Sequence, residues 1–107
     1  MVEPADVTRT TTVELTEGGS VWIGADDAAE MFPGDALVAL PRGDELWLVP
    51  LVGTHAGGLL LKRRNPRGDR AALVSEALRQ CADEQPVGAR RAVWDAAHGA
   101  LRVPVGP

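Results

Sequence analysis

Residues 7 to 15 are rich in β-branched side chains that roughly alternate with polar ones, and residues 21 to 23 form a second short apolar run. Alternation with β-branched residues is typical of half-buried strands. The intervening segment, Glu17-Gly18-Gly19-Ser20, has the composition of a turn. The pattern therefore predicts a β-hairpin in this part of the chain.

A second pair of apolar runs, residues 36 to 40 and 45 to 51, flanks the turn-like Pro41-Arg42-Gly43-Asp44. A glycine at such a reversal can adopt the positive φ that other residues avoid, so we predict a second hairpin. Between the two hairpins, we expect a short helix capped by Asp26 or Asp27 and ended by residues 33 to 35.

The remaining chain predicts one further strand, one helix and a hairpin. Residues 59 to 61 read as a short buried strand. Helical spacing of apolar residues predicts a helix over 70 to 81, with Asp69 near its start, formed around Leu73, Val74, Ala77, Leu78 and Cys81. Residues 92 to 94 and 101 to 103 flank a loop at 95 to 99 and predict a third hairpin. Residues 82 to 89 are expected to be an exposed connection.

The 107 residues fit one domain with one modest core. The 12 Gly and 8 Pro favour short strands over long helices. The expected fold is mainly β: a small β-barrel-like domain built from three hairpins with one or two short helices. We divide residues 1 to 107 into an acidic β subregion at 10 to 51 and a basic extension at 57 to 107, with residues 52 to 58 as a candidate separator.

One cysteine, Cys81, cannot form an internal disulfide, which favours a reducing compartment and predicts a cytoplasmic protein. No run of about 20 apolar residues predicts a membrane span, and the first residues lack the pattern of a secretory signal.

Residues 10 to 51 resemble the swapped-hairpin domain of the AbrB and MazE families. The residues that carry the resemblance are the run 19 to 23, the Ala28-Ala29 helix, Pro33-Gly34-Asp35 and the run 44 to 50. The resemblance implies an intertwined homodimer, and the usual role of the family is DNA binding by transcription regulators or antitoxins. Family members that bind DNA carry basic residues along the helix, where this chain carries Asp26, Asp27 and Glu30.

Charge is separated along the sequence. Residues 1 to 61 hold two arginines against ten acids, a net charge of −8, whereas residues 62 to 107 hold nine basic residues and five acids, a net charge of +4. The basic residues concentrate between positions 62 and 70. This cluster has three interpretations: a solvated loop, a docking surface for an acidic protein, or a phosphate or nucleic-acid site. The candidate contact residues are Lys62, Arg63, Arg64, Arg67 and Arg70, with possible help from Arg90 and Arg91.

Four large apolar residues in the predicted strands are candidates for a core or a dimer interface: Trp22, Leu46, Trp47 and Leu48. His55 and His98 have no Cys or carboxylate at metal-ligand spacing, and Cys81 lies on the apolar face of its predicted helix. We therefore predict no catalytic residue, no metal and no cofactor.

The function that the sequence favours is a non-catalytic accessory or adaptor protein. It would form a homodimer and bind a macromolecular partner, preferably an acidic protein, through residues 62 to 70. The alternative is an AbrB-like DNA-binding transcription regulator or antitoxin, which would bind nucleic acid with strong salt dependence.

Overall fold

The computed structural model describes residues 9 to 52 and 57 to 106. Nine strands and two helices occur in this part of the chain, in the order β1 (Arg9–Leu15), β2 (Ser20–Ile23), α1 (Ala25–Met31), β3 (Ala36–Arg42), β4 (Glu45–Leu51), β5 (Leu59–Leu60), β6 (Lys62–Arg63), β7 (Arg70–Leu73), α2 (Ser75–Cys81), β8 (Gly88–Asp95) and β9 (Ala100–Pro104). The prediction of a mainly β domain with two short helices is confirmed.

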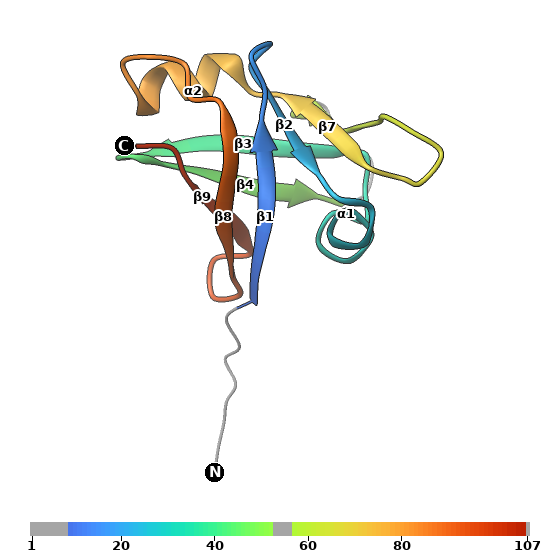
Figure 1. Cartoon of the computed structure of the whole chain (residues 1–107). Helices are drawn as coiled ribbons and strands as arrows, with labels where there is room; N and C mark the ends of the chain where they lie inside the picture. The colour runs from blue at the N-terminus through green and yellow to red at the C-terminus, as the bar shows by residue number, and fades with distance from the viewer. Residues whose placement is uncertain (1–8, 53–56, 107) are drawn as a thin grey trace.

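The strands form one antiparallel, barrel-like sheet in the order β5-β3-β4-β9-β8-β1-β2-β7-β6 (Figure 1). Its two outermost strands, β5 and β6, are separated in sequence only by Leu61. This single bent segment pairs with β3 on one side and with β7 on the other, so it nearly closes the sheet into a barrel. Strands from residues 9 to 51 and from residues 59 to 104 alternate around the same sheet.

All three predicted hairpins are present. β1 pairs with β2, β3 with β4, and β8 with β9, each in antiparallel register. The first strand was expected from residue 7, and residues 7 and 8 lie outside the described part of the chain. The turn between β1 and β2 depends on Gly19, which has a φ of 86° and lies against Ser75, so that a Cβ here would approach the Ser75 Cβ to 2.6 Å.

The core fills the interior of the barrel and is built from the inward-facing positions of the strands. Leu46 and Leu48 of β4 are fully buried, as are Leu15, Ile23 and Leu101 from three other strands. The helices and their cap residues supply Met31 and Phe32 from α1, and Val74, Ala77 and Leu78 from α2. Alternation between buried and partly exposed positions along each strand is what an antiparallel barrel requires.

Three local expectations are wrong. Residues 70 to 73 form β7 and pair with β2, so the helix begins only at Ser75. The N-cap of α1 is Gly24, and Asp27 instead bonds to Arg9 and Thr11 of β1. In the expected buried strand at 59 to 61, Leu61 is buried but Leu60 is exposed.

The possible separator at 52 to 58 falls largely outside the described residues, because 53 to 56 are not described. In the expected exposed connection at 82 to 89, Pro86 is buried and β8 begins at Gly88. None of the helices described is long and apolar enough to cross a membrane.

Candidate binding surface at the basic loop

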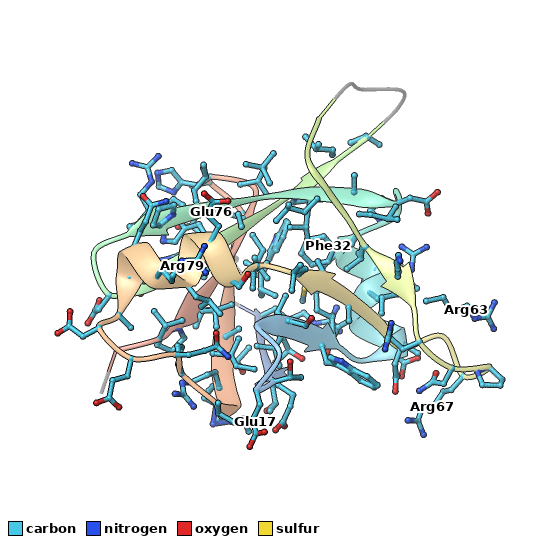
Figure 2. All side chains as sticks on the ribbon, turned by 90° about the horizontal axis from the view of Figure 1, so that it is seen from above. Glu17, Phe32, Arg63, Arg67, Glu76 and Arg79 are labelled. Carbon is cyan, nitrogen blue, oxygen red and sulfur yellow. The ribbon has the colours of Figure 1, made fainter. Side chains whose placement is uncertain are left out.

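The positively charged residues between positions 62 and 70, which we call the basic loop, run from β6 through a turn to the start of β7. Figure 2 shows Arg63 and Arg67 at the end of the molecule away from Glu76 and Arg79 of α2. Lys62, Arg63, Arg64 and Arg67 all have exposed positions. The four are therefore grouped on one short segment and accessible to a partner.

Hydrogen bonds within the segment fix its shape. The Asn65 Oδ1 accepts hydrogen bonds from the backbone N–H groups of Gly68 (3.0 Å) and Asp69 (3.1 Å), and its Nδ2 donates to Asp69 Oδ2 (2.9 Å). The Arg63 guanidinium donates to the carbonyl oxygens of Asn65 (3.0 Å) and Pro66 (2.6 Å). Gly68 has a φ of 107°, a backbone conformation that glycine adopts readily. The charged side chains thus project from an ordered turn.

Asp69 ties this turn to α1. Its Oδ1 accepts the backbone N–H of Ala25, the first residue of the helix, at 2.9 Å. Its Oδ2 accepts a hydrogen bond from Arg67 at 2.7 Å. The Arg67 contact, followed by that of Asn65, lowers the pKa of Asp69 to about 2, because both favour the ionised carboxylate. The sequence places Asp69 near the start of a helix in its own segment. Instead, Asp69 accepts a hydrogen bond at the start of α1, 44 residues earlier in the chain.

Arg64 extends over the outer surface of the barrel, where its guanidinium carbon lies 5.6 Å from the centre of the Trp22 ring. A cation at this separation is attracted by the ring's electron-rich face. Trp22 is partly exposed and lies outside the core. Of its two expected roles, in a core or in a dimer interface, the structure excludes the first, and the second stays a prediction. The reason is register: Trp22 pairs with Ala71 and faces outward, while its neighbours Val21 and Ile23 face inward.

Beside Trp22 lies a shallow groove of about 400 Å³, which we call the Leu60–Leu73 groove. Leu60 and Leu73 are unusually exposed to solvent for leucine, with 57% and 59% of their surfaces exposed. Four strands, together with Arg64 just after β6, supply the lining residues, which are Ser20, Trp22, Leu59, Leu60, Lys62, Arg64, Ala71 and Leu73. The groove thus combines apolar side chains with two positive charges.

On its other side, the basic loop borders a second groove, of about 480 Å³, against α1. Arg63, Arg67 and Arg70 line it together with small apolar residues of the helix. Arg70 makes internal contacts here: it donates to the carbonyl oxygens of Phe32 (3.3 Å) and Gly34 (2.8 Å) and pairs with Asp35 (3.0 Å). Arg70 therefore anchors the Pro-Gly-Asp turn, and we do not count it among the residues presented to a partner.

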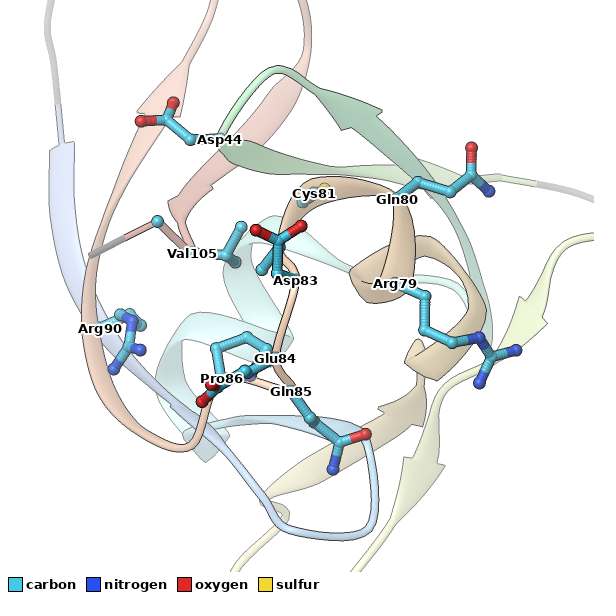
Figure 3. Close-up of a pocket in the computed structure, with 12 residues that line it drawn as sticks. Asp44, Arg79, Gln80, Cys81, Asp83, Glu84, Gln85, Pro86, Arg90 and Val105 are labelled. Carbon is cyan, nitrogen blue, oxygen red and sulfur yellow. The ribbon is translucent and has the colours of Figure 1, made fainter.

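The other two sequence-predicted arginines lie elsewhere, on β8. Arg91 pairs in register with Thr12 of β1, and Arg90 lines a cavity of about 540 Å³ near the end of α2 (Figure 3). That cavity is also lined by Asp44, Asp83 and Cys81. Burial raises the pKa of the Cys81 thiol, which disfavours the thiolate that reactive cysteines need.

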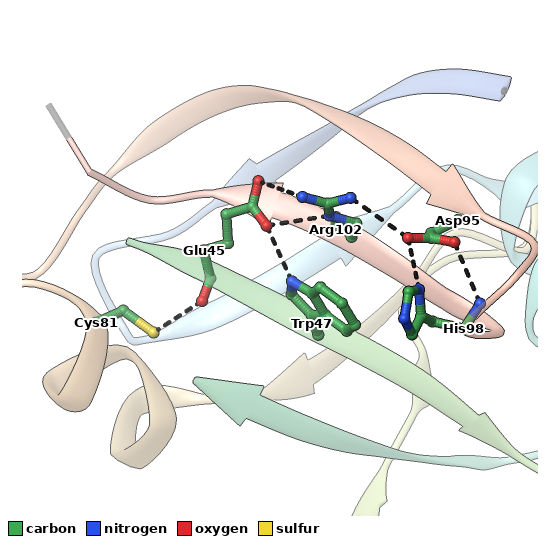
Figure 4. Close-up of polar contacts among 6 residues, drawn as sticks. All are labelled: Glu45, Trp47, Cys81, Asp95, His98 and Arg102. Carbon is green, nitrogen blue, oxygen red and sulfur yellow. Dashed lines mark hydrogen bonds and ion pairs between the residues drawn. The ribbon is translucent and has the colours of Figure 1, made fainter. Parts of the chain in front are cut away.

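Trp47 also faces outward, is partly exposed and lies outside the core. A core position is therefore excluded for Trp47 as well, and a place in a dimer interface stays a prediction. The Trp47 indole N–H donates to Glu45 Oε1 at 2.9 Å, and this bond, more than the contact of Glu45 with Arg102, lowers the pKa of Glu45 (Figure 4). Arg42 and Arg102 lie 5.5 Å and 5.1 Å from the ring centre. In sheet order this network, on β4 and β9, is separated from β6 and β7 by β3 and β5 on one side and by β8, β1 and β2 on the other.

The described residues include no group of three His, Cys, Asp or Glu side chains that could hold a metal ion. His98 contacts Asp95 through Nδ1 at 2.9 Å and lowers the pKa of that carboxyl, while His55 lies outside the described residues. Comparison of the chain with family models, curated proteins and solved structures finds no match.

Proposed function

We propose that the protein is a non-catalytic accessory or adaptor protein that captures an acidic protein partner through the basic loop and the adjoining Leu60–Leu73 groove. The observation that supports this most directly is the exposure of Leu60 and Leu73 beside Lys62 and Arg64. Exposed apolar side chains next to positive charges suit a partner that offers both apolar and acidic groups, and such a combination is characteristic of protein surfaces.

The order of the loop supports the same proposal. A charge run that only improves solubility needs no fixed conformation, whereas this loop is held by Asn65 and Asp69. Fixing the loop before binding lowers the conformational entropy lost on association. Arginine in a fixed position can also form paired hydrogen bonds with a carboxylate, which orient the partner as well as attract it.

We propose that the protein is cytoplasmic, because its single cysteine cannot form an internal disulfide and so favours a reducing compartment. Its partner would reach the basic loop by electrostatic steering, because complementary charge raises the rate of encounter. The groove would then bury apolar side chains of the partner and slow its release.

The test begins with capture of partners from nuclease-treated native lysate, followed by binding of each purified candidate to the full chain. Reversal of three charges, Arg63→Glu, Arg64→Glu and Arg67→Glu, should abolish the interaction while circular dichroism shows an intact fold. The matched single variants Arg64→Glu and Arg79→Glu make the same charge change at opposite ends of the molecule. We expect at least about tenfold weaker binding for the first and no change for the second. Equal effects of the two would refute the proposed site.

Nucleic-acid binding is the second candidate, favoured by one observation. The fold brings Trp22 under Arg64, and an exposed ring beside basic side chains is a platform on which bases stack. The AbrB-like resemblance, which stays a prediction, implies the same class of function. This candidate expects duplex or single-strand binding that weakens steeply with salt, because phosphate contacts release counterions. Binding that is absent at 50 mM salt, or insensitive to salt, would exclude it.

A further inference from the structure

The outer surface of the β3–β4 hairpin is apolar where a solvent-facing strand pair would be polar. Three consecutive outward-facing cross-strand pairs are Val38 with Val49, Leu40 with Trp47, and Arg42 with Glu45. The first four side chains are partly exposed, and none of them packs against the core. We call the surface formed by these six residues, together with Arg102 opposite Trp47 on β9, the Trp47 face.

The inward positions of the same hairpin are already satisfied. Leu37, Leu46 and Leu48 are fully buried in the barrel, so β3 and β4 are apolar on both sides. Antiparallel strands with one solvated face normally alternate apolar and polar residues, whereas continuous apolar strands are typical of sheets covered on both faces. Among the described residues, the barrel interior covers one face of this hairpin. On the other face, His98 lies against Trp47 at 5.1 Å between ring centres without covering Val38, Leu40 or Val49. The composition of the Trp47 face therefore calls for a second covering layer.

We propose that a second copy of this chain covers the Trp47 face, by packing sheet against sheet about a two-fold axis. This inference is independent of the proposed function, because the Trp47 face and the basic loop share no residue. In a two-fold interface each copy presents the same patch, so the patch must be complementary to itself. An apolar centre meets this condition directly, since apolar side chains pack against apolar side chains.

The charges around the Trp47 face meet the same condition. Arg102 pairs with Glu45 at 3.1 Å and with Asp95 at 3.3 Å, and Arg42 lies over Trp47. Two arginines and two carboxylates make this rim electrically balanced. A rim of one sign would repel its own copy across the axis, as two basic loops would. The balanced charge thus favours a second copy over a partner selected by charge.

The size of the face sets the expected strength. Strands of seven residues, at about 3.3 Å per residue, and the three neighbouring strands that carry the face, at about 4.8 Å spacing, give a footprint on the order of 300 Å² per copy. An interface of this extent is below the roughly 1,000 Å² of total buried area usual for stable complexes, so the contact would be weak and transient. We therefore expect a reversible dimer that forms as the protein concentration rises through the micromolar range.

Sedimentation velocity of the full chain from about 1 to 500 µM tests the inference, with dimer at the upper end as the expected result. Leu40→Lys places a charge in the apolar centre and should leave only monomer. The matched control Leu73→Lys makes the same change in the Leu60–Leu73 groove and should leave the dimer unchanged. A chain that stays monomeric throughout, or a dimer lost with Leu73→Lys and kept with Leu40→Lys, overturns the inference.

A milder variant covers the case in which Leu40→Lys does not fold. Val49→Thr keeps the β-branched shape and replaces one outward methyl group with a hydroxyl. Because a hydroxyl buried at an interface loses its hydration, we expect dimerisation about tenfold weaker, with unchanged circular dichroism. An unchanged dimerisation constant for this variant would place the contact elsewhere on the surface and overturn the inference.

Discussion

Trp22 and Trp47 occupy comparable positions on the outside of the barrel, but the charge around them differs. Each ring is partly exposed, and each has an arginine guanidinium within 5.6 Å of its centre. On the groove side of Trp22 the neighbouring charges, Lys62 and Arg64, are positive, and the acidic Glu14 of β1 lies opposite Trp22 in register. Around Trp47 the arginines are offset by Glu45 and Asp95. The same aromatic and cationic pair therefore occurs on two different surfaces, one that we propose captures an acidic partner and one that we propose packs against a second copy.

The largest expected effect separates the outside of β4 from its inside. Leu48→Ala removes a fully buried side chain and should lower the free energy of unfolding by about 3 kcal/mol. Its neighbour Val49 faces outward, so Val49→Ala should cost less than about 1 kcal/mol. Urea denaturation at low micromolar concentration, where the chain is expected to be monomeric, measures both. A loss for Val49→Ala equal to that for Leu48→Ala would mean that the Trp47 face is already buried within one chain.

Replacing each tryptophan with leucine should affect a different interaction. Trp22→Leu should weaken partner capture by at least about tenfold and leave self-association unchanged, because a truncated interface aromatic is costly only where it is buried. Trp47→Leu should weaken self-association by a similar factor and leave partner capture unchanged. Binding assays and sedimentation of the same two variants measure both quantities. If both variants weaken the same interaction and leave the other unchanged, the two surfaces are not functionally distinct.

Acid should act on the basic loop before it acts on the core. The pKa of Asp69 is about 2, below its ordinary value of 3.8, so the folded state prefers the ionised carboxylate. Its stabilising contribution is complete above pH 3.8 and is lost as the pH falls through about 2. The difference in melting temperature between wild type and Asp69→Asn should therefore shrink over this range. An NMR titration that puts the Asp69 pKa at or above 3.8 would contradict the contacts described for the loop.

Salt should have the smallest effect and should distinguish the two surfaces. Raising the salt concentration from about 50 to 500 mM shortens the screening length several-fold, and partner capture through exposed arginines should weaken by about tenfold. Self-association through a charge-balanced, apolar face should change by less than about twofold. Titrations at both salt concentrations provide the comparison. A strongly salt-dependent dimer would indicate that the basic loop takes part in it.

The hairpins could be predicted because the information that specifies them is local. Alternating β-branched residues and turns such as Gly43-Asp44 fix a strand pair over a few positions. The helix at 70 to 81 was predicted too long because Ala71, Ala72 and Val74 suit either element. Pairing with β2, from another part of the chain, makes residues 70 to 73 a strand.

The candidate site was predictable only in part, for the same reason. The basic run is visible in the sequence, but its order depends on Asp69 reaching the start of α1, 44 residues away. The Leu60–Leu73 groove and the approach of Arg64 to Trp22 depend on neighbouring strands that are distant in sequence. The arginines on β8 were grouped with the loop by charge alone, and the fold places them elsewhere.

The bent segment around Leu61 links local stability to function. β5 and β6 each pair with their neighbour through only two residue pairs, so this seam is held by fewer backbone hydrogen bonds than the long β3–β4 or β1–β8 pairs. Regions with few such bonds open first in local unfolding. Opening here would separate Leu60 from Leu73 and would release the basic loop from its fixed geometry. The proposed binding surface would then be lost by local opening of this segment, at a lower free energy than unfolding of the rest of the barrel.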